Sequence, residues 1–202
     1  RAFPPAFLTS PPPPPSVPLK LATPAEATTI IANQLDLDPD RHFPTLAYTP
    51  IAPCKHGHPK AFAFAPLHPG APPSSHLFRL TCPHLVAAID ELERDSALIP
   101  AVNEGIRENR AAREAMRRAH EGHARTRKVL AVRGVEDAAG ASGRKFWRTE
   151  KGLALLETMM ASGVSGEFGD DVKCFHAHVA DYLCRGENPL GRAVLDFLRE
   201  ER

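Results

Sequence analysis

The chain has 202 residues, 43% of them hydrophobic and 24% charged, which is enough for one domain with a real hydrophobic core. Its formal net charge is +1, so no global electrostatic field attracts it to nucleic acid or to an anionic membrane. No apolar run approaches the roughly 18 residues that a membrane span requires. We therefore expect a soluble protein without a membrane span.

The first 22 residues differ from the rest of the chain. They contain the run Pro11 to Pro15, which favours polyproline II, and they carry Arg1 and Lys20 but no acidic residue. This composition is typical of a disordered linker and also of the remnant of an organelle transit segment. We predict that residues 1–22 lie outside the fold and that the protein is cytoplasmic or organellar, with a plastid as the compartment if the segment is a transit remnant.

Residues 23–202 are predicted to form a single α+β domain, mainly helical, with a small antiparallel sheet in its N-terminal third. "TPAEATTIIANQL" begins with Thr23 as an N-cap followed by a proline, which predicts the first helix. Short segments around 45–51, 60–66 and 76–82 contain β-branched or aromatic residues between Pro- and Gly-rich turns, which predicts two or three strands.

From Cys82 onward the apolar spacing is helical. Cys82 is the expected N-cap of the first of these helices, and Pro100 is expected to interrupt the second. The segment 134–145, "GVEDAAGASGRK", is predicted to be a flexible loop because of its glycines. The remaining helices are expected over 110–132, over 149–161, after an N-cap at Asp170 or Asp171, and after Asn188-Pro189.

The predicted helix after residue 110 is rich in arginine. An RNA or phosphate surface is one interpretation, and a solvated helix face is the other. Glu108, Glu114 and Glu121 alternate with the arginines and no aromatic residue is interleaved, which favours the solvated face and disfavours nucleic acid as a partner. His120 and Glu121 could form an acid/base pair, but neighbouring helical residues point in different directions.

The sequence holds a set of soft metal ligands without any Cys-x-x-Cys pair. "CKH" at 54–56 and "CFH" at 174–176 repeat a Cys-x-His spacing. On a helix Cys174 shares a face with His178, whereas His176 points about 200° away, so Cys174 and His176 could bind one ion only if the helix starts at or after Cys174. From the residues alone, a buried thiol beside a satisfied histidine is the commoner arrangement. Cys184 is best explained by packing.

Four separated stretches resemble the Domain of Unknown Function 501 family, a mostly bacterial group. They are "PCKHGHP", "LTCPHLVAAIDELE", "MRRAHEGHARTR" and "DVKCFHA" with "GENPLG", and the resemblance extends over roughly 24–195. The family's function is not established, so the resemblance implies no reaction. It implies that the following residues belong to family motifs: Cys54, Gly57, Pro59, Cys82, Pro83, His120, Glu121, Asp171, Lys173, Cys174, His176, Asn188, Pro189 and Gly191.

Because three cysteines and one histidine lie in these motifs, our first hypothesis is a protein that binds a divalent metal, with zinc as the expected ion. Its expected ligands are Cys54 from a β-turn, Cys82 at one helix start, and Cys174 with His176 at another. A helix N-terminus is expected to lower the pKa of Cys174. Two alternatives stay open: a metal-free helical interaction module, and an enzyme that uses Cys174 as a nucleophile.

Overall fold

The computed structural model describes residues 20–23, 28, 30, 46–48, 56–64, 77–146, 149–152, 154, 162–164, 166–167 and 171–200. Within these ranges it gives the backbone alone for several strand residues and for residues 133–144. The helices predicted over 23–35 and 149–161 fall mostly outside the described residues. No helix in the described part of the chain is long and apolar enough to cross a membrane.

The predicted sheet is present and has four antiparallel strands in sequence order, one more than expected. Its register pairs Lys20 with Tyr48, Ala47 with Ala63, and Ala61 with Leu80. Since Lys20 belongs to the first strand, the described fold starts before the predicted boundary at residue 23. The strands are β1 (Lys20–Leu21), β2 (Leu46–Tyr48), β3 (Ala61–Phe64) and β4 (Phe78–Leu80).

Two short helices follow the sheet, and α3 (Pro83–Glu93) has Cys82 as its N-cap, as predicted. Pro83 stands in the first turn, where its missing N–H costs no helical hydrogen bond. The next helix is α4 (Leu98–Glu108). Pro100 does not interrupt it, contrary to expectation, because this proline also falls in a first turn.

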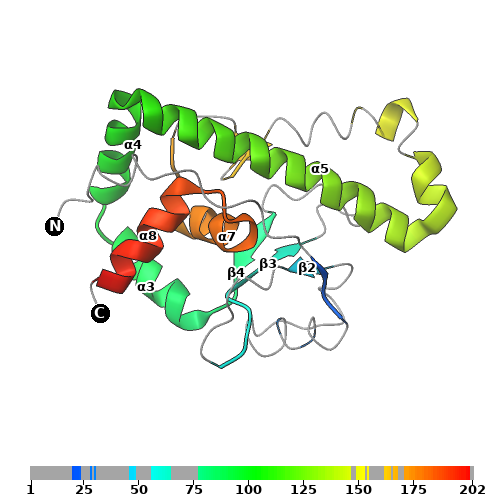
Figure 1. The fold of residues 1–202 in the computed structure, drawn as a ribbon, viewed down its shortest axis with the longest axis horizontal. Coiled ribbons are helices and arrows are strands. Elements are labelled where there is room, and N and C mark those ends of the chain that lie inside the picture. The colour runs from blue at the N-terminus through cyan, green and yellow to red at the C-terminus, as the bar shows by residue number, and fades with distance from the viewer. Residues whose placement is uncertain are drawn as a thin grey trace.

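The longest helix is α5 (Arg110–Phe146), which runs along one side of the molecule (Figure 1). Asn109 caps it through Oδ1, which accepts the N–H groups of Ala111 at 2.9 Å and Ala112 at 3.1 Å. The loop predicted over 134–145 was wrong, because α5 continues through it. Each glycine there costs about 1 kcal/mol relative to alanine, but extending an existing helix avoids the nucleation cost and the intervening alanines favour helix.

Beyond α5 lie a two-residue hairpin, β5 (Ser162–Gly163) with β6 (Gly166–Glu167), and then two helices, α7 (Phe175–Arg185) and α8 (Pro189–Glu200). The N-cap of α7 is Cys174, so the predicted cap at Asp170 or Asp171 was placed too early. Gly186 ends α7 in the left-handed conformation, with φ of 75°. Asn188 then starts α8, as predicted, by accepting the Gly191 N–H at 2.9 Å.

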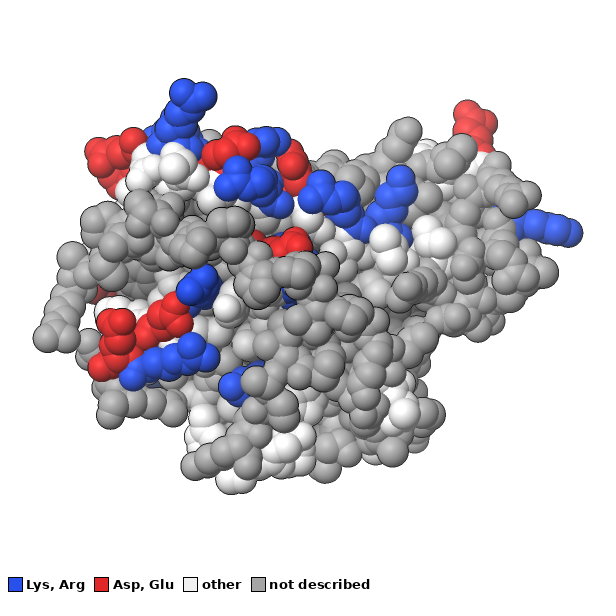
Figure 2. Space-filling model, in the orientation of Figure 1, with Lys and Arg blue, Asp and Glu red and all other residues white. Residues whose placement is uncertain are grey.

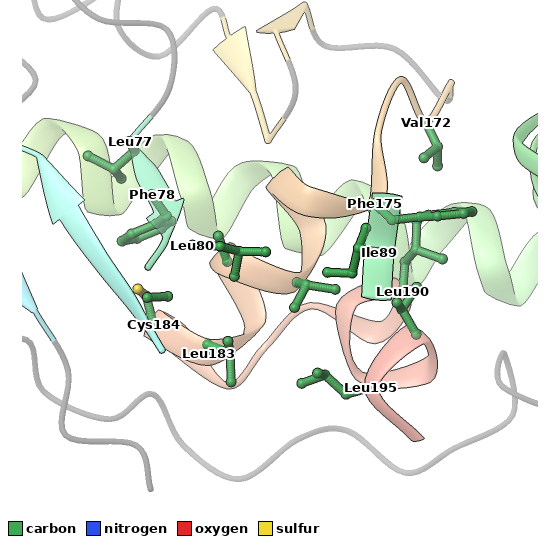
Figure 3. Packing of buried hydrophobic residues seen from close by; sticks show 14 of the residues in the cluster. Leu77, Phe78, Leu80, Ile89, Val172, Phe175, Leu183, Cys184, Leu190 and Leu195 are labelled. Atoms are coloured by element: carbon green, nitrogen blue, oxygen red, sulfur yellow. The ribbon is translucent and has the colours of Figure 1, made fainter. Parts of the chain in front are cut away.

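The core forms where α7 meets the sheet, α3 and α8, with α5 on its other side (Figures 1 and 3). Phe175, Val179 and Leu183 supply the apolar stripe of α7, and Cys184 is completely buried among core residues, as its packing interpretation predicted. Gly191 allows α8 to approach α7 closely, because an added Cβ would lie 2.1 Å from the carbonyl oxygen of His178. These contacts fix both ends of α7 relative to the rest of the domain.

Candidate functional site

The first turn of α7 carries two of the predicted metal ligands. Cys174 has an extended backbone, with φ of −156° and ψ of 148°, and the helix begins at the next residue. The sequence required the helix to start at or after Cys174, and it does. Cys174 is therefore not fixed on the opposite side of a helix from His176. Both residues are half-buried. The segment that leads to them is held by Asn103, whose side chain accepts the Val172 N–H at 2.7 Å and donates to the Val172 carbonyl at 3.1 Å.

His176 lies against the last turns of α3, between two carboxylates. Its Nε2 is 3.3 Å from Oδ1 of Asp90, and its Nδ1 is 3.2 Å from Oε1 of Glu93. Glu93 also accepts the N–H of Phe175, the first residue of α7. The acidic end of α3 thus supplies both carboxylate neighbours for the histidine and a cap for the helix that carries it.

Burial raises the pKa of the Cys174 thiol. The N–H groups of Ala177 and His176 act in the opposite direction, but the charge of Glu93 adds to the rise. The expectation that the helix start lowers this pKa was therefore wrong in direction. The helix effect is present and is outweighed by desolvation and by a neighbouring carboxylate. Without a metal, the thiol stays protonated at neutral pH.

Cys82 stands at the opposite end of α3 from Glu93. The rise along an α-helix between these two positions is about 16 Å. Cys82 is tied instead to the end of the β-turn that precedes β3: its N–H and that of Thr81 bond to the Lys60 carbonyl at 3.4 and 2.8 Å, and the Thr81 hydroxyl bonds to the Pro59 carbonyl at 2.6 Å. That turn contains Gly57 with φ of 79°.

Cys54 lies outside the described residues. Within the ranges that the structure describes, no three Cys, His, Asp or Glu side chains are arranged to hold a metal ion, and Cys82, Cys174 and Cys184 are free thiols. The four-ligand set of Cys54, Cys82, Cys174 and His176 therefore stays a prediction. Of the three predicted ligands that the structure describes, Cys174 and His176 lie at the start of α7. Cys82 lies beside the turn that precedes β3.

A second group of polar residues is buried between α5, α7 and the start of α8. Asp181 is its centre and is fully buried. Arg185 binds its carboxylate with two hydrogen bonds, from Nε at 2.9 Å and Nη2 at 2.7 Å. His123 contacts it through Nδ1 at 2.6 Å, and Asn188 donates to it at 3.0 Å. The guanidinium also donates to the Ala119 carbonyl at 2.8 Å, so one ion pair connects three helices.

Burial alone raises the pKa of Asp181, but the charge of Arg185 and the hydrogen bond with His123 outweigh it and hold this pKa well below its ordinary value. Burial lowers the pKa of His123, and lowers that of His178 to about 3, so both imidazoles are neutral at physiological pH. His178 Nδ1 is 3.1 Å from the Asn188 amide nitrogen. His178 is fully buried in the core, whereas His176 is half-buried, which makes His176 the better candidate ligand of the two.

His120 belongs to the same buried region, where its ring lies 6.0 Å from that of His178 and its Nδ1 accepts the Val164 N–H at 3.0 Å. Glu121 points elsewhere and pairs with Arg117, so these two neighbours do not form an acid/base pair. Sequence reasoning missed His123 and Arg185. The spacing of Asp181 and Arg185, four residues apart on one helix, was the signal that could have found the ion pair.

Arg110, Arg117, Arg118 and Arg125 of α5 are exposed, as the solvated-face interpretation predicted, whereas Arg127 is buried with 2% of its surface exposed. Arg117 pairs with Glu114 and Glu121, and Arg118 pairs with Glu114. Figure 2 shows positive and negative side chains intermingled along the edge where α4 and α5 run, rather than a continuous positive surface.

The fold and its motifs define a helix-dominated α+β protein in which Cys82 and Cys174 are the N-cap residues of α3 and α7. A family model described as a protein of unknown function, DUF501, matches residues 51–196. The chain belongs to this family. The match contains all four motif stretches but begins at residue 51, later than the resemblance suggested. The chain has no significant match among curated proteins or among solved structures.

Proposed function

We propose that this protein binds a divalent metal, with zinc as the preferred ion, and that Cys174 and His176 are its first two ligands. The observation that carries the proposal is the extended backbone of Cys174 directly before α7. This conformation releases Cys174 and His176 from the 200° separation of a helix, so a thiolate and an imidazole can approach one ion.

The surroundings of the pair suit a cation. The carboxylates of Asp90 and Glu93 lie next to the His176 ring at 3.3 and 3.2 Å. A bound metal would deprotonate Cys174 despite the raised pKa of its thiol, since zinc ligates the thiolate and releases the proton. The same raised pKa disfavours the alternative in which Cys174 acts as a nucleophile without metal, because the thiol form predominates at neutral pH.

For the remaining ligand positions the sequence names Cys54 and Cys82. The Lys60 carbonyl accepts the N–H groups of Thr81 and Cys82, so the turn lies beside the start of α3, which is the end of that helix opposite to Glu93 and His176. Four protein ligands would give a structural site, and three would leave an open position where bound water becomes acidic enough for hydrolysis.

The test is metal content. Untagged protein purified without chelator is analysed for zinc by mass spectrometry, together with Cys174→Ser, His176→Ala and the control Cys184→Ala. We expect one zinc per chain in the parent protein, loss of zinc in the first two variants, and retention in the control. Absence of metal from the parent protein after reconstitution with Zn²⁺ would overturn the proposal and leave the helical interaction module as the better account.

A further inference from the structure

Two imidazole nitrogens in the buried cluster around Asp181 have no hydrogen-bond partner among the residues that the structure describes. They are Nε2 of His123 on α5 and Nε2 of His178 on α7. The two histidines are 2% and 0% exposed. Leaving a buried polar atom without a partner is costly, so both nitrogens require a further group that the described residues do not supply.

The tautomer of His123 is fixed by Asp181. Arg185 binds the Asp181 carboxylate with two hydrogen bonds and keeps it ionised, so this carboxylate can only accept. Its Oδ1 lies 2.6 Å from Nδ1 of His123, which places the proton of the neutral imidazole on Nδ1. The pKa of His123 is lowered by burial, so the ring stays neutral. Nε2 of His123 is therefore an acceptor that lacks a donor.

His178 has the opposite tautomer. The Asn188 amide nitrogen donates to Oδ2 of Asp181 at 3.0 Å, and the amide oxygen accepts the Gly191 N–H at 2.9 Å, which fixes the orientation of the amide. The same nitrogen lies 3.1 Å from Nδ1 of His178, so Nδ1 accepts and Nε2 carries the proton. Nε2–H of His178 is therefore a donor that lacks an acceptor.

We propose that this cluster is a binding site for a molecule with a hydroxyl group, which donates a hydrogen bond to Nε2 of His123 and accepts one from Nε2–H of His178. A hydroxyl group does both, whereas a carboxylate cannot donate and an ammonium cannot accept. The two histidines belong to one hydrogen-bonded cluster, because His123 contacts Asp181 directly and His178 contacts it through Asn188.

The surrounding charges favour an uncharged ligand. Asp181 pairs with Arg185, which also donates to Glu187 at 3.1 Å. Arg127 is buried as well and lies one helical turn after His123 on α5. The guanidinium groups and carboxylates of this region balance, so an added ion would bring an uncompensated charge into the core. Water and the hydroxyl group of a small polyol both have the required chemistry, and the experiment separates them.

The experiment is nitrogen-15 NMR of the histidine side chains in the protein as purified. We expect His123 to be protonated at Nδ1 and His178 at Nε2. Glycerol is the probe for an organic hydroxyl, and its titration should shift the signals of both rings saturably. Cross-peaks between the two rings and a long-lived water that persists at high glycerol would identify water as the hydroxyl. Acetate and methylammonium are the controls, since the first cannot donate and the second cannot accept, and neither should shift these signals.

His178→Phe is the matched variant, because it keeps a ring but removes the donor. It should abolish the response of His123 to glycerol, or the cross-peak of the His123 ring with the bound water. His84→Gln at an exposed position should leave both unchanged. If His178→Phe does not fold, the comparison of glycerol with acetate and methylammonium in the parent protein still decides.

The inference is overturned if the two tautomers are the reverse of those expected, or if acetate shifts the signals as glycerol does. It is also overturned if neither glycerol nor a long-lived water reaches the two rings of the folded protein. Zinc content enters none of these measurements, so the outcome is independent of the metal proposed above.

Discussion

Asp181 on α7 and His123 on α5 are joined by a hydrogen bond of 2.6 Å, and their side chains are 0% and 2% exposed. The contact spans 58 positions of sequence and lies next to the bidentate pair of Asp181 with Arg185. The interface between the two helices is therefore not purely apolar. A buried charge set of this kind restricts how α5 and α7 can dock, since other arrangements would leave a charge unpaired.

Replacing Asp181 by alanine should destabilise the protein by about 3–5 kcal/mol, because the Arg185 guanidinium would stay buried without its partner. Urea unfolding measures the change. The control is Asp196→Ala on α8, where the carboxylate is 46% exposed and pairs with exposed Arg199, so the expected change is within about 0.5 kcal/mol.

If Asp181→Ala is too unstable to study, Asp181→Leu combined with Arg185→Met removes both charges together. The double variant should recover much of the lost stability, since apolar side chains of similar size can replace a buried ion pair. If Asp181→Ala and Asp196→Ala lower the free energy of unfolding equally, the buried ion pair contributes no more stability than the exposed one.

The close approach of α8 to α7 can be tested at Gly191. Alanine there would place its Cβ 2.1 Å from the His178 carbonyl oxygen and 2.7 Å from the Tyr182 Cβ. Since one of these neighbours is backbone, we expect α8 to shift and the free energy of unfolding to fall by about 1–3 kcal/mol or more. The matched control is Gly105→Ala within α4, where nothing lies within 4 Å and alanine should stabilise by about 0.5–1 kcal/mol. A stabilised Gly191→Ala variant would contradict the packing.

Stability should decrease as the pH falls below about 6.5, through the buried histidines. Burial lowers the pKa of His178 to about 3, whereas an unfolded histidine titrates near 6.5. Between these values the unfolded chain binds a proton that the folded protein does not, so acidification favours unfolding. Above pH 6.5 both states are neutral at this position, and its contribution no longer changes with pH.

The measurement is the melting temperature between pH 7 and 4.5, a range above the ordinary pKa of Asp181. His178→Gln retains a polar side chain but cannot be protonated, so its melting temperature should depend less on pH. The exposed His84→Gln serves as the control for the loss of one histidine. A variant slope as steep as that of the parent would exclude His178 as the source.

The helical state of residues 134–145 predicts slow amide hydrogen exchange in that segment relative to an unstructured peptide of the same sequence. The physical reason is that α5 continues through Phe146, which places these N–H groups in helical hydrogen bonds. Hydrogen exchange with mass spectrometry checks this, and Gly140→Pro should increase the exchange locally by breaking the helix. Exchange as fast as in the free peptide would restore the flexible loop that the glycines suggested.

The sequence by itself determined the elements whose signals are local. The cap at Cys82 with Pro83 and the start at Asn188 were predicted because capping and turn chemistry depend on a few adjacent residues. Three of the four strands were predicted from short aromatic and β-branched segments, and the family from its four motifs.

Tertiary structure alone decided the start of α7, the helical state of 134–145 and the partners of the polar side chains. Asp171 is a good N-cap by type, yet α7 begins after Cys174, where Glu93 accepts the N–H of Phe175 and Asn103 accepts that of Val172. The intrinsic preference of a residue for a helical position contributes less free energy than such long-range hydrogen bonds. His123 and Asp181 meet only because the fold brings α5 onto α7, and the pKa of Cys174 rises because burial outweighs the helix N-terminus. Burial and long-range contacts are properties of the folded chain, so no local pattern contains them.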